Sequence, residues 1–213
     1  GFPTTTFNSA NYWVDVIFDN TPQTYSIWEQ GAITGSPSAD DPSAVEVGMK
    51  FKSDVSGSVT GLAFYKGATN TGPFLGHLWT LTGTQLAEKS YTNNTSEEGW
   101  QVITFDAPVS ISANTTYVIS YYTQSGNYAA TGGYFTTEVY NAPLKALANN
   151  DPDGPNGVFF YGTGGGFPTG TYNSGNYWVD VLFTPDLPID LTPPVVLSTT
   201  PANAATGVNV SNN

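Results

Sequence analysis

Aromatic and polar side chains that could together bind a sugar recur along this chain. His77 and Trp79 are two residues apart on an expected strand, so both side chains point to the same face. A sugar ring stacks its C–H faces on exposed Trp or Tyr, while its hydroxyls need Asn, Asp, His or Gln nearby. The sequence offers the following residues for such a ligand site: His77, Trp79, Tyr122, Asn127, Tyr128 and Tyr134. The alternative interpretation is that these aromatics pack in the core and in ordinary loops.

Oxygen side chains that could bind a hard cation gather in one short loop, NNDPDGPNG, at Asn149–Gly157. Calcium prefers carboxylate, amide and carbonyl oxygens, and the candidate ligands here are Asn149, Asp151, Asp153 and Asn156. The loop is not an EF-hand, since no glutamate follows at the twelfth position. The acidic turn SADD at Ser38–Asp41 is similar in kind. Asp-Pro and Asp-Gly pairs also form ordinary turns, so both interpretations stay open.

Catalysis finds little support in the sequence. The single histidine is His77, and the chain has no cysteine, no GxSxG motif and no HExxH motif. Paired carboxylates could hydrolyse glycosides, but they would have to meet across a cleft. The candidates are scattered over short turns and strands: Glu46, Asp106, Glu138, Asp151 and Asp153. We therefore expect a protein that is not an enzyme.

The composition indicates an extracellular setting. Seventeen acidic residues against five lysines and no arginine give a net charge of −12. Nucleic acids and anionic membranes need a basic surface, so neither is expected as a partner. No stretch of eighteen apolar residues could span a membrane. A secreted protein without cysteine favours a bacterial origin, on the cell surface or outside the cell.

Short strands separated by turns dominate the pattern. At Val45–Phe51, apolar residues alternate with polar ones or glycine, the two-residue period of a half-buried strand. Further strands rich in Val, Ile, Thr and aromatics are expected at 59–65, 76–81, 85–92, 100–105, 115–122, 159–161 and 177–183. The one weak helix candidate is Ala142–Ala148. This pattern predicts an all-β fold, an antiparallel β-sandwich that is jelly-roll-like or immunoglobulin-like.

The first eighteen residues of the chain return near its end. GFPTTTFNSANYWVDVIF at Gly1–Phe18 matches GFPTGTYNSGNYWVDVLF at Gly166–Phe183 at 14 of 18 positions, with a constant offset of 165. Such self-similarity indicates repeated structural units, so residues 1–18 are predicted to be the terminal strand of a preceding repeat. That strand is expected to self-associate through a sheet edge. In each copy the aspartate of YWVDV, Asp15 or Asp180, is expected to pair with a lysine.

The remaining boundaries follow from the repeat and from proline. Residues 19–24 are predicted to be a linker, residues 25–184 the β-sandwich module, and residues 185–194 a proline-rich linker. The last residues, 195–213, continue a PPVVLSTTPANAATGV segment that resembles the opening strands of a bacterial immunoglobulin-like domain. We expect that domain to be truncated.

The module itself resembles a known bacterial family. The segments TYSIWEQG, AVEVGMKFKSDVSGSVTGLAFYKGATNTGPFLGHLWT, GWQVITFDAPVSISANTTYVISYYT and NYWVDVLF are similar to the family called domain of unknown function 4082, from Tyr25 to Phe183. The resemblance implies a secreted, multidomain bacterial protein that carries such modules beside immunoglobulin-like repeats. It implies no established activity.

Together these features predict a non-catalytic extracellular module of a repetitive bacterial surface or secreted protein. Its expected partner is a polysaccharide or a cell-surface glycan. The alternative is a purely structural repeat: a spacer, an adhesin stalk or a filament subunit that assembles through strand pairing. A glycan binder should have a groove lined with aromatic and amide side chains, on a sheet face or at a loop end. A spacer should bury its aromatics and make its contacts at the module ends.

Overall fold

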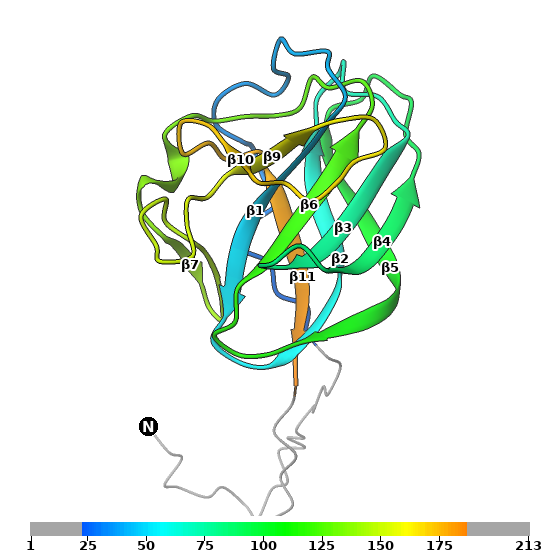
Figure 1. The fold of residues 1–213 in the computed structure, drawn as a ribbon. Helices are drawn as coiled ribbons and strands as arrows, with labels where there is room; N and C mark the ends of the chain where they lie inside the picture. The colour runs from blue at the N-terminus through cyan, green and yellow to red at the C-terminus, as the bar shows by residue number, and fades with distance from the viewer. Residues whose placement is uncertain (1–22, 187–213) are drawn as a thin grey trace, which may run out of the picture. The chain divides into compact units, whose positions relative to one another are not determined.

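The computed structural model describes residues 23–186, and strands dominate this part of the chain (Figure 1). Its one helical segment is η1, a single turn of 3-10 helix at Tyr134–Thr136. Two antiparallel sheets pack face to face, so the predicted all-β antiparallel sandwich is confirmed. Within the described range, no helix is long and apolar enough to cross a bilayer.

The larger sheet has eight strands, and its main path runs in the order β10-β9-β1-β6-β3-β4. Its strands are β1 (Val45–Ser53), β3 (Phe74–Thr80), β4 (Gln85–Tyr91), β6 (Tyr117–Thr123), β7 (Val139–Asn141), β8 (Leu144–Ala146), β9 (Val158–Tyr161) and β10 (Gly170–Thr171). The smaller sheet has the order β11-β2-β5, from β2 (Gly57–Lys66), β5 (Gly99–Ile111) and β11 (Val179–Pro185). The end of the repeated motif thus forms β11, an edge strand of the smaller sheet.

The core lies between the two sheets and is built by alternation along each strand. Val45, Val47 and Met49 of β1 point inward and are buried, as the sequence pattern predicted. Phe64 of β2 meets Tyr121 of β6 across the sandwich, with stacked rings 4.2 Å apart. Burying an aromatic side chain of this size contributes about 1.5–3 kcal/mol to stability, so these pairs hold the layers together.

One edge of β1 is shared by two short strands, and a side chain fills the gap between them. β9 pairs with Val45–Gly48 and β8 with Phe51–Ser53, which leaves Met49 and Lys50 of β1 between them. The amide of Asn156 takes this place: its Oδ1 accepts from the Lys50 N–H at 2.7 Å, and its Nδ2 donates to the Lys50 carbonyl at 3.1 Å. Asn156 therefore continues the sheet where no strand does.

The weak prediction of a helix at Ala142–Ala148 was wrong. Its centre is the strand β8, which forms a hairpin with β7 and pairs with β1. Leu144 and Ala146 are buried with half-buried Lys145 between them, the alternation of a strand. Pairing with the end of β1 outweighs the modest helix propensity of this short segment.

Some predictions fall on residues outside the described range. They are the strand at Gly1–Phe18 with its self-association, most of the linkers at 19–24 and 185–194, and the immunoglobulin-like start at 195–213.

Candidate functional site

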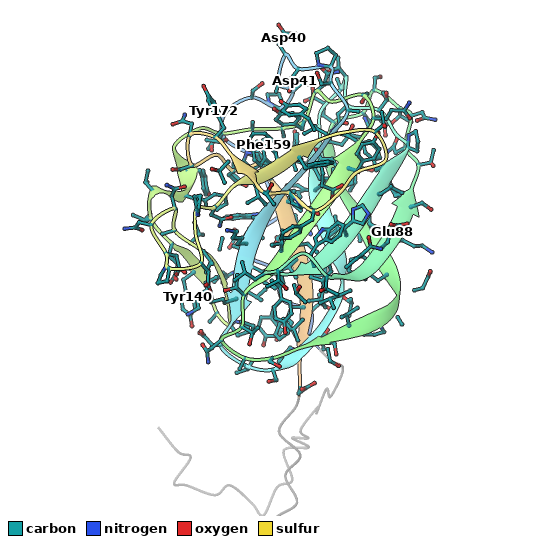
Figure 2. All side chains as sticks on the ribbon, viewed as in Figure 1. Asp40, Asp41, Glu88, Tyr140, Phe159 and Tyr172 are labelled. Atoms are coloured by element: carbon teal, nitrogen blue, oxygen red, sulfur yellow. The ribbon has the colours of Figure 1, made fainter. Side chains whose placement is uncertain are left out.

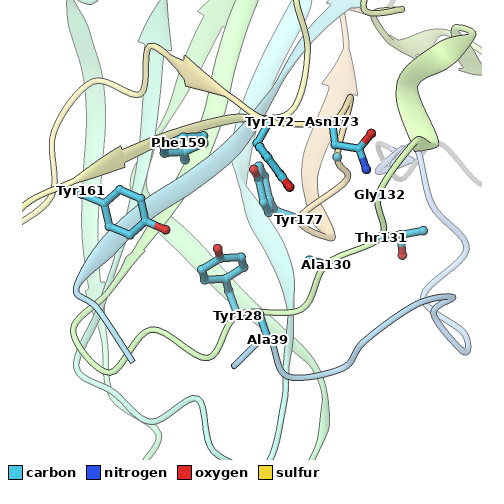
Figure 3. Close-up of a pocket in the computed structure, with 11 residues that line it drawn as sticks. Ala39, Tyr128, Ala130, Thr131, Gly132, Phe159, Tyr161, Tyr172, Asn173 and Tyr177 are labelled. Atoms are coloured by element: carbon cyan, nitrogen blue, oxygen red, sulfur yellow. The ribbon is translucent and has the colours of Figure 1, made fainter. Parts of the chain in front are cut away.

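A groove with a volume of about 390 Å³ opens at the end of the sandwich where Figure 2 labels Asp41, Phe159 and Tyr172, and Figure 3 shows it close up. Five aromatic side chains line it, together with amide, hydroxyl and backbone groups. The lining residues are Ala39, Tyr128, Ala130, Thr131, Gly132, Phe159, Tyr161, Tyr172, Asn173, Gly175 and Tyr177. We call this site the tyrosine groove. Its size falls in the range of small-molecule sites, which is about 300–1,000 Å³.

Three separate segments supply the tyrosines, and Figure 3 shows their rings gathered around one hollow. Tyr128 comes from the loop after β6, and Tyr161 ends β9. Tyr172 and Tyr177 flank the turn that leads into β11. Tyr128 and Tyr177 pack edge to face with ring centroids 5.4 Å apart, which fixes both rings. Tyr172 is 74% exposed and leaves its ring free for a ligand.

The turn that presents Tyr172 depends on unusual backbone angles. Asn173 and Ser174 both have positive φ, 49° and 46°, as the central residues of a type I′ turn require. The Gly175 N–H donates to the Tyr172 carbonyl at 3.0 Å and closes the turn. A neighbouring segment of the same chain holds the turn in place, since the Gly133 N–H donates to the Asn173 carbonyl at 2.7 Å. The exposed Tyr172 therefore stands on a rigid support.

Asp41 connects two of the tyrosines through their hydroxyl groups. Its Oδ2 accepts hydrogen bonds from the Tyr161 hydroxyl at 2.5 Å and from the Tyr128 hydroxyl at 3.2 Å. Burial alone would raise the pKa of Asp41, but hydrogen bonds from Tyr161, Ser43 and Tyr128 outweigh it and lower that pKa. The carboxylate is therefore ionised at neutral pH. Asp41 orients both phenol rings and sets a negative charge beside the groove.

The predicted ligand residues His77, Trp79 and Tyr122 lie elsewhere, on the outer face of the larger sheet. The structure brings them together, with the His77 and Trp79 rings 4.9 Å apart, but it buries them. Trp79 is 6% exposed and its Nε1 donates to the Ser120 hydroxyl at 2.8 Å. The expectation that these three residues form an accessible stacking surface is corrected here.

The cover over this face is the glycine-rich loop between β9 and β10, which crosses β1 and β6 in Figure 1. At Gly165 a Cβ atom would lie 2.6 Å from Glu46 Oε2, 3.2 Å from Tyr122 Cβ and 3.4 Å from His77 Cε1. Phe167 of the same loop packs on Trp79, with ring centroids 5.7 Å apart. Because the loop approaches this closely, no sugar ring can stack on Trp79 while the loop is in place.

His77 serves as a polar link beneath that loop. Its Nδ1 lies 2.9 Å from Glu46 Oε1 of β1, and its Nε2 lies 3.2 Å from Glu88 Oε2 of β4. Burial by itself lowers the pKa of His77, but the hydrogen bonds and charges of the two glutamates outweigh it and raise that pKa. Burial raises the pKa of Glu46. The cluster joins three strands, while the second carboxylate oxygen of Glu46, Oε2, is buried without a hydrogen-bond partner.

The last three predicted ligand residues divide between groove and packing. Tyr128 lines the tyrosine groove. Its neighbour Asn127 has φ of 52° and donates from Nδ2 to the Ser125 carbonyl at 2.8 Å, which stabilises the loop. Tyr134 packs edge to face on Trp28 and Trp178, with centroids 5.6 and 5.3 Å away. Of the six predicted residues, the groove thus contains one.

The predicted cation loop at Asn149–Gly157 is crossed by lysine side chains. Lys52 Nζ lies 3.5 Å from Asp151 Oδ1 and 3.1 Å from Asp153 Oδ2. Lys50 Nζ donates to the Asp153 carbonyl at 2.7 Å. Asn156 is buried and bonded to β1, and Asn149 is exposed. The Lys52 ammonium group thus lies between the two carboxylates, where a bound cation would sit.

Among residues 23–186 no three His, Asp or Glu side chains gather as a metal-binding group. The carboxylates considered for catalysis have separate surroundings. Glu46 bonds to His77, Asp106 pairs with Lys89, and Asp153 pairs with Lys52. Glu138 is exposed. None of these carboxylates lines the tyrosine groove.

The prediction that Asp180 pairs with a lysine was wrong. This buried carboxylate instead accepts three backbone N–H groups: Ile27 and Val181 donate to Oδ1, both at 2.8 Å, and Trp28 donates to Oδ2 at 3.0 Å. Burial, partly opposed by those three hydrogen bonds, raises the pKa of Asp180 to about 7. The carboxylate ties the first described segment of the chain to β11.

Sequence reasoning missed most of the groove. Phe159, Tyr161, Tyr172, Asn173 and Tyr177 were not among the predicted ligand residues, although one signal was available. The last three belong to the repeated motif, where Phe7, Asn8 and Tyr12 occupy the matching positions of the first copy. An exposed aromatic and an amide that recur at fixed positions in a repeat mark a surface rather than a core.

The model of the family described as Domain of unknown function (DUF4082) matches residues 32–179. No curated protein matches the chain.

Proposed function

We propose that this chain, which belongs to the DUF4082 family, is a non-catalytic extracellular module that binds glycans in its tyrosine groove. The parent would be a repetitive bacterial surface or secreted protein. The observation that carries the proposal is the combination of exposed Tyr172 with Asn173 on one rigid turn, opposite Tyr128 and Tyr161. The proposed ligand surface thus lies at a loop end, and not at His77 and Trp79 on the outer face of the larger sheet.

The side chains of the groove fit the two kinds of surface that a sugar presents. Tyr172 offers its exposed ring to apolar C–H groups, while Tyr177, which is buried, supports Tyr128 through their edge-to-face contact. The Asn173 amide and the phenol oxygens of Tyr128 and Tyr161 offer polar atoms to hydroxyls. Because several of these side chains are held by packing or hydrogen bonds, little conformational entropy is lost on binding.

The test is the Tyr172→Ala variant of the full chain. A side chain that is 74% exposed contributes little to folding, so the melting temperature should stay within a degree or two of the wild-type value. Loss of its stacking area should weaken binding to a glycan found on an array by about 5- to 150-fold, equivalent to about 1–3 kcal/mol.

A matched control is Tyr140→Ala. Tyr140 is 56% exposed, lies on β7 and does not line the groove. This variant should bind as the wild type does. Equal losses in both variants, or no loss in Tyr172→Ala, would place the ligand elsewhere.

The 18-residue repeat supports a second role as a structural unit of an array. Residues 1–18 carry the sequence of β11 with the segment before it, and such a strand could pair with a sheet edge of a neighbouring copy. In that case a chain without residues 1–22 should remain folded but sediment as a monomer, whereas the full chain should self-associate. A truncated chain that no longer folds would show that this segment is an integral strand of the module.

A further inference from the structure

We propose that the tyrosine groove selects uncharged saccharides and rejects those that carry a carboxylate or a sulfate. This inference rests on the proposed glycan-binding function and names the ligand class of the same site. Three features lead to it: the use of the tyrosine protons, the charge beside the groove, and the positions of the lysines.

The hydroxyl protons of two groove tyrosines are already used. Tyr161 and Tyr128 both donate to Asp41 Oδ2, and a phenol has one proton to give. Their oxygens can therefore only accept hydrogen bonds from a ligand. Sugar hydroxyls can donate to them, but an ionised carboxylate or sulfate has no proton to donate. This wall of the groove therefore favours neutral, hydroxyl-rich rings.

The local charge acts in the same direction. Asp41 is ionised, because its hydrogen bonds hold its pKa below the ordinary value, and exposed Asp40 precedes it on the same loop. An anionic sugar in the groove would face this charge while losing its own hydration. The cost of desolvating an anion is recovered only where a cation or several donors replace the water.

No lysine lines the groove, and the chain has no arginine. Each of the five lysines contacts acidic side chains or carbonyl groups elsewhere. Lys50 binds the Asp153 carbonyl, Lys52 pairs with Asp151 and Asp153, Lys66 binds the Thr95 and Glu97 carbonyls, Lys89 pairs with Asp106, and Lys145 pairs with Asp54. The single histidine, His77, is buried beneath the β9–β10 loop. A cation to balance an anionic ligand is therefore absent from this site.

Neutral ligands keep suitable partners. Tyr172 and Asn173 extend from their turn and provide donors as well as acceptors, so hydroxyls can bond in both directions. The ring faces of the groove need no charge on the ligand. The selectivity thus comes from the lack of a cation and of tyrosine protons for an anionic ligand, rather than from an extra contact to neutral sugars.

The experiment uses the full chain on an array of neutral oligosaccharides, each printed beside the same oligosaccharide bearing a sulfate, a sialic acid or a uronate. We expect binding to neutral members and at least tenfold weaker binding to their charged counterparts. The Asp41→Asn variant should reduce this ratio at least threefold. Asp40→Asn removes the same charge from the same loop without touching the tyrosine hydrogen bonds, and should change the ratio less than Asp41→Asn does.

Salt provides a measurement that needs no variant. Raising the ionic strength screens Asp41, so binding of the charged members should improve relative to that of the neutral ones. Charged members that bind as well as neutral ones at low salt would overturn the selectivity while leaving glycan binding intact. Binding to no member of the array would overturn the proposed function and the selectivity together.

Discussion

Asp180 should make the module less stable as the pH rises through the weakly acidic range. Its carboxyl is fully buried between β11 and the segment Ile27–Trp28, where burial and three N–H donors oppose each other. Burial outweighs the donors and raises its pKa from 3.8 to about 7. Between these two values the folded protein keeps a proton on Asp180 that the unfolded chain has released. Stability from this group is thus complete below about pH 3.8 and is lost as the pH rises through about 7.

The size of the effect follows from the difference between the two pKa values. About three pH units, at about 1.36 kcal/mol for each unit, correspond to about 4 kcal/mol of unfolding free energy. About 3 kcal/mol of this loss should fall between about pH 4.5 and pH 7.5. Asp180→Asn has no proton to exchange, so it should lack this slope. It carries a constant penalty of about 1–3 kcal/mol instead, because the Asn amide group that replaces Oδ2 faces the Trp28 N–H.

The assay is urea denaturation of the wild type and of Asp180→Asn at several pH values, followed by tryptophan fluorescence. Other titrating groups are common to both proteins and cancel in the difference. The wild type should exceed the variant most at low pH, and the gap should shrink steadily as the pH rises. A gap that is constant, or that grows with pH, would refute the reasoning, since it would mean that the three N–H donors and not burial set the pKa.

Three further predictions concern the covered sheet face and the acidic loop. An NMR titration of His77, the one imidazole in the chain, should give a midpoint above 6.5, and Glu88→Gln should lower it; a midpoint below 6.5 would show that burial prevails over the glutamates. Gly165→Ala should cost at least about 1 kcal/mol more stability than Gly164→Ala. Gly165 and Gly164 both have positive φ, 79° and 87° respectively, but a Cβ atom at Gly165 would lie 2.6 Å from a side chain, whereas a Cβ atom at Gly164 would meet open space. Equal losses of stability in thermal or urea melts would contradict this contact. Calcium at about a hundredfold its dissociation constant should raise the unfolding free energy of Lys52→Ala by about 2.7 kcal/mol, and chelator should reverse this gain. The gain should exceed that of the wild type, because the Lys52 ammonium group no longer competes with calcium for the carboxylates of Asp151 and Asp153. Melting curves that calcium changes in neither protein would exclude a calcium site in this loop.

Local sequence was enough to predict the class of fold and most strands. Val45, Val47 and Met49 alternate with residues of the opposite face, and a strand exposes its two faces with a period of two residues. This signal is carried by neighbours in the chain and needs no knowledge of the partner strand. The short strands β7, β8 and β10 were not predicted from this signal, because two or three residues are too few to show a period. Such short segments become strands only by pairing with a neighbouring strand.

The candidate site was much harder to predict for a physical reason. His77 and Trp79 were correctly placed on one face of one strand, but the sequence does not show that the β9–β10 loop, more than eighty residues later, covers that face. Burial depends on contacts between distant segments. In the same way the cation loop carries the right oxygen atoms, but the neighbouring β1 brings Lys50 and Lys52 against them.

The sequence by itself therefore determined the all-β architecture, the acidic and cysteine-free surface, and the repeat that supplies Tyr172, Asn173 and Tyr177. These properties are local or compositional. Only the tertiary structure decided which aromatics face solvent. It brings the turn after β10 against the loop after β6 and the end of β9, and so assembles a groove from segments that are far apart in the chain. A site of this kind exists only in the relative positions of its segments, and these are set by the packing of the whole module.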